Sequence, residues 1–261
     1  MDILKTIVEQ KKQEVAAARL HIPESEIRRK AHGLSAPRSF FHALEKPAQT
    51  GINIIAEIKR ASPSKGWIRK ELDSRAYAVS YERGGAAAIS VLTDGPNFNG
   101  SAEDLREARK ATSLPVLRKD FLICSYQIYQ SKVMEADAVL LIALILSQGQ
   151  LKEYLHLAGE LGLDALVEVH TEADLEKATK AGAKLIGINN RNLRSFKTDI
   201  RTAVRLKTLL EPHQIAVAES GIKTRGDILA LQKAGIWNFL IGESLVRAED
   251  PQTFLKQLLG R

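Results

Sequence analysis

Eight short apolar runs constrain the fold of this chain more than any other feature of its sequence. They occupy residues 52–59, 86–92, 114–119, 137–144, 164–169, 184–189, 214–219 and 237–242. Runs that are apolar throughout, rather than alternately apolar and polar, are typical of strands buried on both faces. The segments between them have the periodicity of amphipathic helices, and regular alternation of strand and helix predicts a parallel sheet.

The number of strand–helix units decides between the two common kinds of parallel sheet. An open, doubly wound sheet normally has a glycine-rich phosphate-binding motif after its first strand, and no such motif follows residues 52–59. Eight units match a sheet that closes on itself, and the length of 261 residues fits a barrel of about 250 residues. We therefore predict an α/β protein whose single (β/α)8 TIM barrel spans residues 51–261. Residues 1–50 are predicted to form a helical extension packed on the barrel.

Composition excludes several protein classes. Cys124 is the one cysteine in the chain, which excludes an internal disulfide and a cysteine-rich metal site. The longest unbroken apolar run, residues 138–146, is far shorter than the roughly 20 residues of a membrane-spanning helix. Apolar and charged residues alternate at helical spacing near the N-terminus, whereas a signal peptide has a continuous apolar stretch there. We expect a cytoplasmic protein without membrane association.

The net charge of +7 is distributed unevenly along the chain. Residues 59–75 and 191–207 are strongly basic, and each stretch begins at the end of a predicted strand. A nucleic-acid surface typically interleaves basic with aromatic residues, but aromatic residues make up only 5% of this chain. The pattern favours a pocket for a small anion such as a phosphate or carboxylate, with a solvated basic surface as the alternative.

Polar side chains, most of them ionisable, stand at the ends of the predicted strands. They include Glu57, Lys59, Lys119, Glu168, Asn189, Arg191, Glu219, Ser220 and Glu243. The carboxyl ends of barrel strands meet at one face, where the catalytic groups of such barrels lie. Ionisable groups on buried strands are costly unless they are paired or functional. We therefore expect these side chains to converge on one site.

The same residues lie within motifs that resemble the indole-3-glycerol-phosphate synthase family, (β/α)8 enzymes of tryptophan biosynthesis. The motifs are IIAEIKRASPSKG (54–66), VLRKDFL (116–122), LVEVH (166–170), IGINNRNL (186–193), VAESGI (217–222) and FLIGESL (239–245). The resemblance runs from about residue 50 to the C-terminus, and the N-terminal extension is also similar to that of the family. It implies a carboxy-lyase that closes the ring of 1-(2-carboxyphenylamino)-1-deoxyribulose 5-phosphate, losing carbon dioxide and water. It implies no cofactor and no metal.

The resemblance also implies roles for the catalytic residues. Lys119 is similar in position to the general acid that protonates the ketose oxygen during ring closure. Lys59 matches the lysine that engages the substrate carboxylate or assists proton transfer, and Glu168 matches the glutamate of the dehydration step. Which lysine serves which step stays open. Glu57 is expected to orient the lysines and keep them charged, and Asn189 completes the catalytic set.

The remaining implied contacts bind the substrate. Arg191, with Asn189, is similar to the polar pair near the substrate's carboxylate and hydroxyls, and Glu219 and Ser220 resemble the hydroxyl and anthranilate-side contacts. Apolar walls for the aromatic ring are expected from Phe98, Phe121 and Leu193. The phosphate is expected at Ser62, Gly221, Gly242 and the backbone amide of Glu243, since the loops after the last two strands are the usual phosphate site of such barrels.

Three further residues matter for the comparison with the family. Cys124 stands where an acidic residue is expected, and Glu135 stands where a glycine usually precedes Ala-Asp-Ala. Both follow the third strand, away from the matched catalytic positions. His170 lies two residues after Glu168. We expect it to make a structural hydrogen bond behind the site, with a proton shuttle beside the glutamate as the alternative.

Two other functions remain as hypotheses. The phosphoribosylanthranilate isomerase of the same pathway requires a catalytic cysteine at the end of its first strand, where this chain has Glu57-Ile58-Lys59. A nucleic-acid-binding protein would use the positive surface, and its binding would fall steeply with salt. We expect instead a small anionic substrate carrying phosphate and carboxylate, with no nucleic acid, membrane or obligate protein partner.

Overall fold

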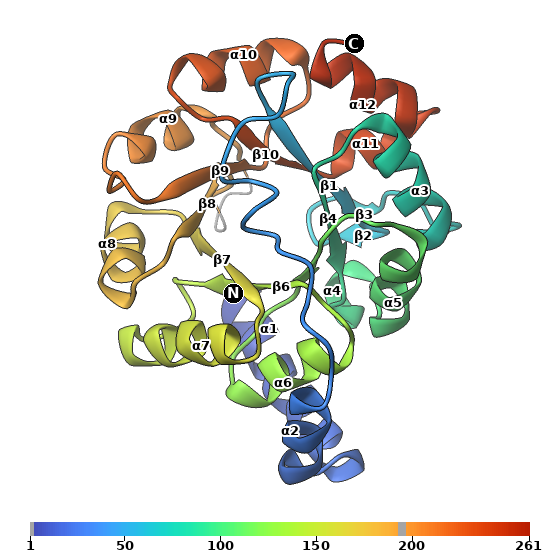
Figure 1. Ribbon diagram of the computed structural model, residues 1–261, viewed down its shortest axis with the longest axis vertical. Helices are drawn as coiled ribbons and strands as arrows, with labels where there is room; N and C mark the ends of the chain where they lie inside the picture. The colour runs from blue at the N-terminus through green and yellow to red at the C-terminus, as the bar shows by residue number, and fades with distance from the viewer. Residues whose placement is uncertain (1–2, 193–196) are drawn as a thin grey trace.

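The computed structural model describes residues 3–192 and 197–261, and in this part of the chain eight parallel strands close into a barrel (Figure 1). The strands are β1 (Asn53–Ile58), β4 (Ala88–Leu92), β5 (Val116–Lys119), β6 (Ala138–Ile142), β7 (Asp164–Val169), β8 (Leu185–Asn189), β9 (Ile215–Glu219) and β10 (Asn238–Ile241). Each lies within one of the predicted apolar runs. Because β1 pairs with both β4 and β10, the sheet has no edge. The predicted (β/α)8 barrel is confirmed.

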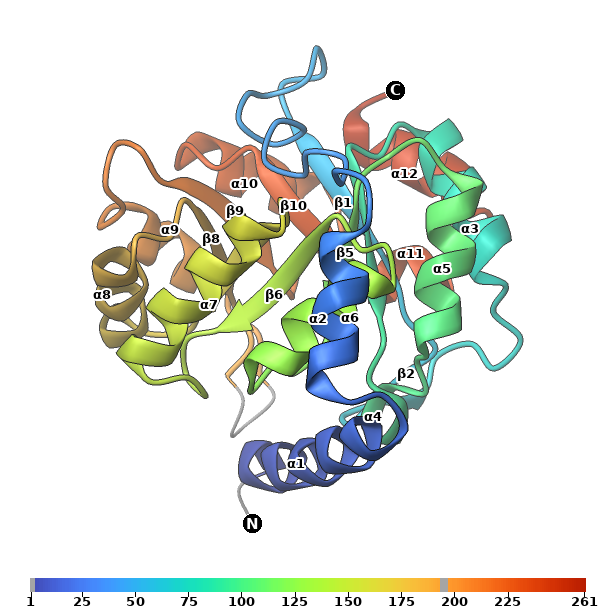
Figure 2. The same cartoon turned by 60° about the horizontal axis from the view of Figure 1, so that its bottom comes forward.

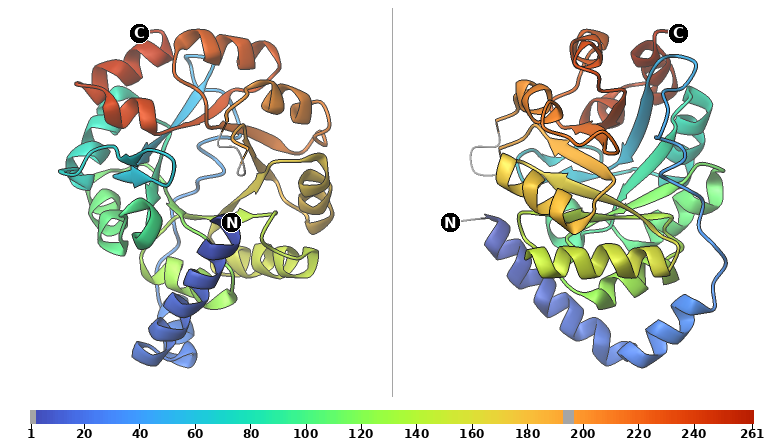
Figure 3. Two further views of the ribbon diagram at one scale, coloured as in Figure 1. Left: turned by 180° about the vertical axis from the view of Figure 1, so that it is seen from behind. Right: turned by 60° about the vertical axis from the view of Figure 1, so that its left-hand side comes forward.

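Helices surround the barrel and cover the outer faces of its strands (Figures 1 and 3). They are α3 (Ser74–Gly84), α5 (Ala102–Ala111), α6 (Ser125–Val133), α7 (Gln148–Glu160), α8 (Glu172–Ala181), α9 (Arg201–Lys207), α10 (Arg225–Lys233) and α12 (Pro251–Leu259). Shorter elements lie in the loops: the hairpin β2 (Ala61–Ser62) and β3 (Gly66–Trp67), α4 (Gly95–Phe98) and α11 (Glu243–Arg247). No helix in the described ranges is both long and apolar enough to cross a bilayer.

The interior of the barrel is divided into an apolar layer and a polar layer. Toward the amino ends of the strands the interior holds a buried aliphatic cluster that includes Ile55, Leu117 and Val217. Side chains two residues apart on a strand share a face, so Glu57 and Lys119 follow Ile55 and Leu117 on the inner face of β1 and β5. The polar layer therefore lies at the carboxyl ends, directly above this apolar floor.

The segment before β1 contacts both ends of the barrel. Helix α1 (Ile3–His21) crosses the face formed by the carboxyl ends of the strands, and α2 (Glu24–His32) packs against α6 (Figures 2 and 3). The chain then runs to the opposite end, where Phe40 and Leu44 are buried against the apolar floor. There the backbone N–H of Phe41 donates to Asp164 and Asn238 donates to the carbonyl of Leu44. The division of the chain at about residue 50 stays a prediction.

The two positions that depart from the family pattern lie at the ends of α6. Cys124 is the N-cap residue of this helix, and its side chain makes no capping hydrogen bond. Glu135 follows the helix with a φ of 63°, a left-handed conformation that glycine adopts at no steric cost. This left-handed backbone explains why the family pattern has a glycine at position 135. Glu135 adopts the same conformation with a Cβ atom, at a cost in strain.

Candidate active site

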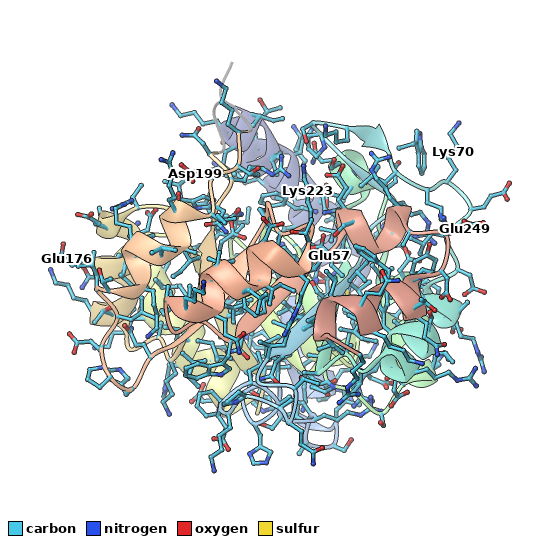
Figure 4. All side chains as sticks on the ribbon, turned by 90° about the horizontal axis from the view of Figure 1, so that it is seen from above. Glu57, Lys70, Glu176, Asp199, Lys223 and Glu249 are labelled. Atoms are coloured by element: carbon cyan, nitrogen blue, oxygen red, sulfur yellow. The ribbon has the colours of Figure 1, made fainter. Side chains whose placement is uncertain are left out.

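A cavity of about 750 Å³ lies at the carboxyl ends of the barrel strands. Fourteen of the predicted site residues line it: Glu57, Lys59, Ser62, Phe98, Lys119, Phe121, Glu168, Asn189, Arg191, Glu219, Ser220, Gly221, Gly242 and Glu243. Leu193, also predicted, lies outside the described residues. Figure 4 shows Glu57 in the interior of the molecule, whereas Lys70, Glu176 and Glu249 project from its outside. Side chains from strands far apart in the sequence thus converge on one space.

Lys119 stands at the centre of the charged groups. Its ammonium Nζ lies 2.9 Å from Glu219 Oε2 on β9 and 3.1 Å from Glu168 Oε2 on β7. Burial acts to lower the pKa of Lys119, but the carboxylates of Glu219, Glu168 and Glu57 outweigh it and raise that pKa above its ordinary value. Lys119 is therefore held as an ammonium, the form that can donate a proton.

The two glutamates that contact Lys119 differ in their protonation. Burial acts to raise the pKa of Glu168, but Lys119, His170 and a hydrogen bond with Asn189 bring it below its ordinary value. Burial raises the pKa of Glu219 to about 7 despite the nearby Lys119. The Oε1 atom of Glu219 is buried and has no hydrogen-bond partner among the described residues. Near neutral pH, Glu168 is a charged base and Glu219 can hold a proton.

Two glycines make room for the buried carboxylates. A Cβ atom at Gly187, on β8, would lie 2.1 Å from Glu219 Oε1, and one at Gly242 would lie 2.2 Å from Glu57 Oε1. A side chain at either position would therefore force the carboxylate beside it to shift, so each glycine preserves the placement of one glutamate. Gly187 was not among the predicted site residues, although a glycine inside a strand is a recognised sign of close approach by another group. Gly242, predicted for phosphate binding, also accommodates Glu57.

Glu57 and Lys59 form a pair on β1 and its carboxyl end. Lys59 Nζ donates to Glu57 Oε1 at 2.5 Å, and the Lys59 side chain is only partly exposed. The Glu57 carboxylate is also close enough to raise the pKa of Lys119. This arrangement fits the predicted role of Glu57 in orienting the lysines, which stays a prediction.

Three of the four phosphate-binding candidates, Gly221, Gly242 and Glu243, follow β9 and β10, which are neighbours in the barrel, whereas Ser62 lies in β2 after β1. Ser220 and Gly221 both adopt left-handed backbone conformations, with φ of 65° and 78°. Glu243 is the first residue of α11, and its carboxylate accepts a hydrogen bond from Arg247 Nε at 3.1 Å. The side chain of Glu243 is thus engaged along its own helix. This geometry fits the expectation that its backbone amide, rather than its carboxylate, faces an anion.

Several cationic residues of the cavity lining were missed by sequence reasoning. They are Lys65, Lys197, Lys223 and Arg247. Lys65 and Lys197 lie within the two basic stretches noted in the sequence, so the charge distribution did indicate this face. Lys223 and Arg247 follow β9 and β10. Their positions shortly after the ends of predicted strands could have identified them as residues of the cavity lining.

The apolar wall of the cavity combines predicted and unexpected residues. The rings of Phe98, from α4, and Phe121, after β5, lie 6.2 Å apart between centroids and are tilted by 39°. Ile3, Leu4 and Ile7 of α1 also line the cavity. The sequence pattern identified α1 as an amphipathic helix but did not show that its apolar face covers the site.

His170 lies behind Glu168. Its Nε2 atom is 3.4 Å from Glu168 Oε1, and both ring nitrogens are buried without a hydrogen-bond partner among the described residues. The ring is not part of the cavity lining. Its role, structural support or proton shuttle, stays a prediction. Within residues 3–192 and 197–261, no group of three or more His, Cys, Asp or Glu residues is arranged to hold a metal ion.

Comparisons with known proteins point to one family over nearly the whole chain. A family model described as indole-3-glycerol phosphate synthase matches residues 4–258. A relative from Desulfosudis oleivorans with this name is 58% identical over 259 residues, covering 99% of this chain and 98% of the relative. Another with the same name, from Syntrophobacter fumaroxidans, is 52% identical with the same coverage of both chains.

Two solved structures from Pyrococcus furiosus share the fold. A mutant tryptophan synthase alpha-subunit has a TM-score of 0.60 at 16% identity, covering 80% of this chain and 98% of that chain. A thiamine phosphate pyrophosphorylase has a TM-score of 0.58, also at 16% identity, covering 79% of this chain and 93% of that chain. At this level of identity the two structures support the barrel fold alone.

Proposed function

Because the chain belongs to the indole-3-glycerol phosphate synthase family, we propose that the 750 Å³ cavity is its active site. The protein is a carboxy-lyase of tryptophan biosynthesis. It closes the ring of 1-(2-carboxyphenylamino)-1-deoxyribulose 5-phosphate, with loss of carbon dioxide and water, to give indole-3-glycerol phosphate. The observation that best supports this assignment of the site is the Lys119 ammonium between Glu168 and Glu219.

Ring closure needs an acid at the ketose oxygen. As the aromatic carbon that bears the carboxylate attacks the ketose carbon, negative charge develops on the carbonyl oxygen. We assign its protonation to Lys119, because the surrounding carboxylates keep this lysine charged. The substrate carboxylate then leaves as carbon dioxide, and its bonding electrons restore the aromatic ring. Lys59, held by Glu57, is the candidate for engaging that carboxylate.

Dehydration needs a base and a second acid. We assign removal of the ring proton to Glu168, since its lowered pKa keeps it ionised at neutral pH. A lysine then protonates the departing hydroxyl, which leaves as water. Both Lys59 and Lys119 lie in the same cavity, so the choice between them is a matter for experiment.

Substrate binding is proposed to use the rest of the lining. The phosphate would bind at the end formed by Ser62, Gly221, Gly242 and the Glu243 amide, where oriented backbone N–H groups favour an anion. The anthranilate ring would pack against Phe98 and Phe121, with Leu193 as a further predicted wall. Asn189, Arg191, Glu219 and Ser220 also line the cavity, and we assign them to the hydroxyls and the carboxylate of the substrate between these two ends.

We further propose that the chain acts on this small anionic substrate in the cytoplasm without nucleic acid or an obligate protein partner. The lysines and arginines that line the cavity support an anionic small molecule as the ligand. The single cysteine, which cannot form an internal disulfide, suits a reducing compartment.

The direct test is turnover. We expect the purified chain to convert the carboxyphenylamino-deoxyribulose phosphate to an indole product, followed by indole fluorescence. The same protein should leave phosphoribosylanthranilate unchanged, because Glu57-Ile58-Lys59, at the carboxyl end of β1 and just after it, contains no cysteine. Absence of indole formation would refute the assignment, and isomerisation of phosphoribosylanthranilate would favour the alternative enzyme.

A further inference from the structure

A buried lysine outside the assigned catalytic set joins α1 to the barrel. Lys11 is 2% exposed, whereas its neighbour Lys12 projects into solvent with 59% of its side chain exposed. The Lys11 ammonium lies 2.7 Å from Glu14 Oε2, 2.8 Å from Asp94 Oδ1 and 3.0 Å from Asp120 Oδ1. Asp94 and Asp120 are themselves buried. A charged group removed from water in this way needs such partners, and these partners come from three separate elements.

The contact with Asp120 reaches the residues on either side of it. Asp120 Oδ2 accepts hydrogen bonds from Thr93 at 2.7 Å and Arg118 at 2.8 Å, while Oδ1 accepts from the Phe121 N–H at 2.8 Å and faces Lys11. Asp120 stands between Lys119, the proposed acid, and Phe121, part of the proposed ring pocket. Fixing both oxygens of this side chain fixes the backbone from which Lys119 and Phe121 project.

The contact with Asp94 reaches the other aromatic ring. Asp94 Oδ2 accepts from the backbone N–H of Asn97 at 2.9 Å and so caps α4, the short helix that ends at Phe98. The second oxygen of Asp94 faces Lys11. One ammonium therefore touches both carboxylates that support the Phe98 and Phe121 rings.

The helix that supplies Lys11 also contributes to the cavity. Ile7 lies four residues before Lys11, on the same face of α1, and lines the cavity together with Ile3 and Leu4. A single buried ion-pair cluster thus holds three parts of the site: the covering helix, the aromatic wall and the end of β5.

We propose that Lys11 is a positioning residue for the reaction, acting through Asp120 and Asp94 on the placement of Lys119 and the aromatic wall. The inference rests on the proposed function of Lys119. Loss of the Lys11 ammonium leaves two buried carboxylates without their shared cation, and they shift to find other partners. Catalysis depends on sub-ångström placement of the acid, so the loss falls on the chemical step. The phosphate-binding candidates after β9 and β10 are outside this cluster, so binding at that end is retained.

The test compares Lys11→Met with Lys12→Met in the full chain. Methionine keeps the length and apolar stem of lysine without its charge. Lys12 is the adjacent residue of the same helix, and its ammonium pairs with Glu9 at the surface. We expect kcat to fall at least about tenfold in Lys11→Met, with KM within about threefold of wild type. Lys12→Met should match wild type in both constants. Circular dichroism and a thermal melt establish the folded fraction at the assay temperature.

The outcomes separate this proposal from the proposed function. A folded Lys11→Met protein with kcat within twofold of Lys12→Met overturns the positioning role, and so does a loss confined to KM. If Lys11→Met does not fold, Asp94→Asn decides: a fall in kcat of threefold or more supports the proposal, and an unchanged kcat overturns it. Absence of indole formation by the wild type refutes the proposed function itself, whatever Lys11 does. Retained activity in Lys119→Ala refutes only the acid role assigned to Lys119.

Discussion

The Lys119 ammonium meets the Glu219 carboxylate at 2.9 Å, although the strands that carry these residues stand on opposite sides of the barrel. In the ring of strands, β5 and β9 are separated by three strands in either direction. Both side chains reach inward above the apolar floor and meet near the axis of the barrel. The charge of each therefore depends on the presence of the other, and this coupling determines what substitutions should do.

Replacing Lys119 should impair chemistry far more than binding. In Lys119→Ala the proposed proton donor is lost, and we expect kcat to fall by about 10²–10⁴-fold, the usual contribution of a general acid. Substrate affinity should change much less, because the donor acts mainly as charge shifts in the transition state. Steady-state indole fluorescence and equilibrium substrate binding measure the two effects. Lys180→Ala, at an exposed position on α8, is the control, and equal losses of catalysis and affinity would count against the acid role.

Replacing Glu168 should separate ring closure from dehydration. We expect Glu168→Gln to bind substrate and close the ring, since the amide oxygen can still accept a hydrogen bond from Lys119, 3.1 Å away. The amide cannot remove the ring proton, so the dehydration step should stall. Rapid quenching followed by mass spectrometry should show an intermediate that has lost carbon dioxide but retains the water. Release of the final product at the wild-type rate would be incompatible with this role.

The raised pKa of Glu219 predicts a pH-dependent stability. Burial raises this pKa from 4.5 to about 7, so the folded state binds the proton more tightly than the unfolded state. The stabilisation from this group is complete below pH 4.5 and is lost as the pH rises toward 7. Relative to Glu219→Gln, the wild type should lose up to about 3 kcal/mol of unfolding free energy between pH 5 and pH 8.

Urea denaturation at several pH values measures this difference. Glu153→Gln, at an exposed position on α7, controls for the removal of a carboxylate and should keep the wild-type pH dependence. If wild type and Glu219→Gln lose the same unfolding free energy over this range, Glu219 does not hold a proton in the folded state.

Relieving the backbone at Glu135 should stabilise the protein. Glu135→Gly places a residue without Cβ at a φ of 63°, and we expect the unfolding free energy to rise by about 0.5–1 kcal/mol. Glu135→Ala retains a Cβ and should show no such gain, which makes it the matched control. Denaturation of both variants in urea tests this, and equal stability of the glycine and alanine variants would argue that the left-handed backbone is not strained.

The strands and the polar residues at their ends could be predicted from the sequence. A strand with consecutive apolar residues can be buried only where both of its faces are covered, so the eight apolar runs predicted the strands and implied a closed sheet. Residues that end the runs, such as Glu57 and Lys119, then had to share one face of the barrel. Because the carboxyl ends of barrel strands surround one cavity, the position of a residue at the end of a run was enough to predict that it lines the site.

The role of α1 could not be predicted in the same way. Lys11 lies beside Lys12 in the sequence, and the amphipathic pattern of this helix predicts that both lysines are exposed to solvent. What distinguishes them is the pair Asp94 and Asp120, which are distant in sequence and meet Lys11 only in the folded chain. Similarly, the need for a glycine at position 187 comes from Glu219 on the neighbouring strand.

The space reserved beside Glu219 and Glu57 has a consequence for engineering this scaffold. A substitution at a glycine can displace either acid while the acid itself stays unchanged. An alanine at Gly187 would occupy the volume that the Glu219 carboxylate fills, and an alanine at Gly242 would do the same to Glu57. Substitutions at these two positions should therefore reduce activity by moving the acids, although glycine offers no functional group. Conversely, shortening Glu219 or Glu57 would open a void against a bare backbone, a starting point for introducing new chemistry into the barrel.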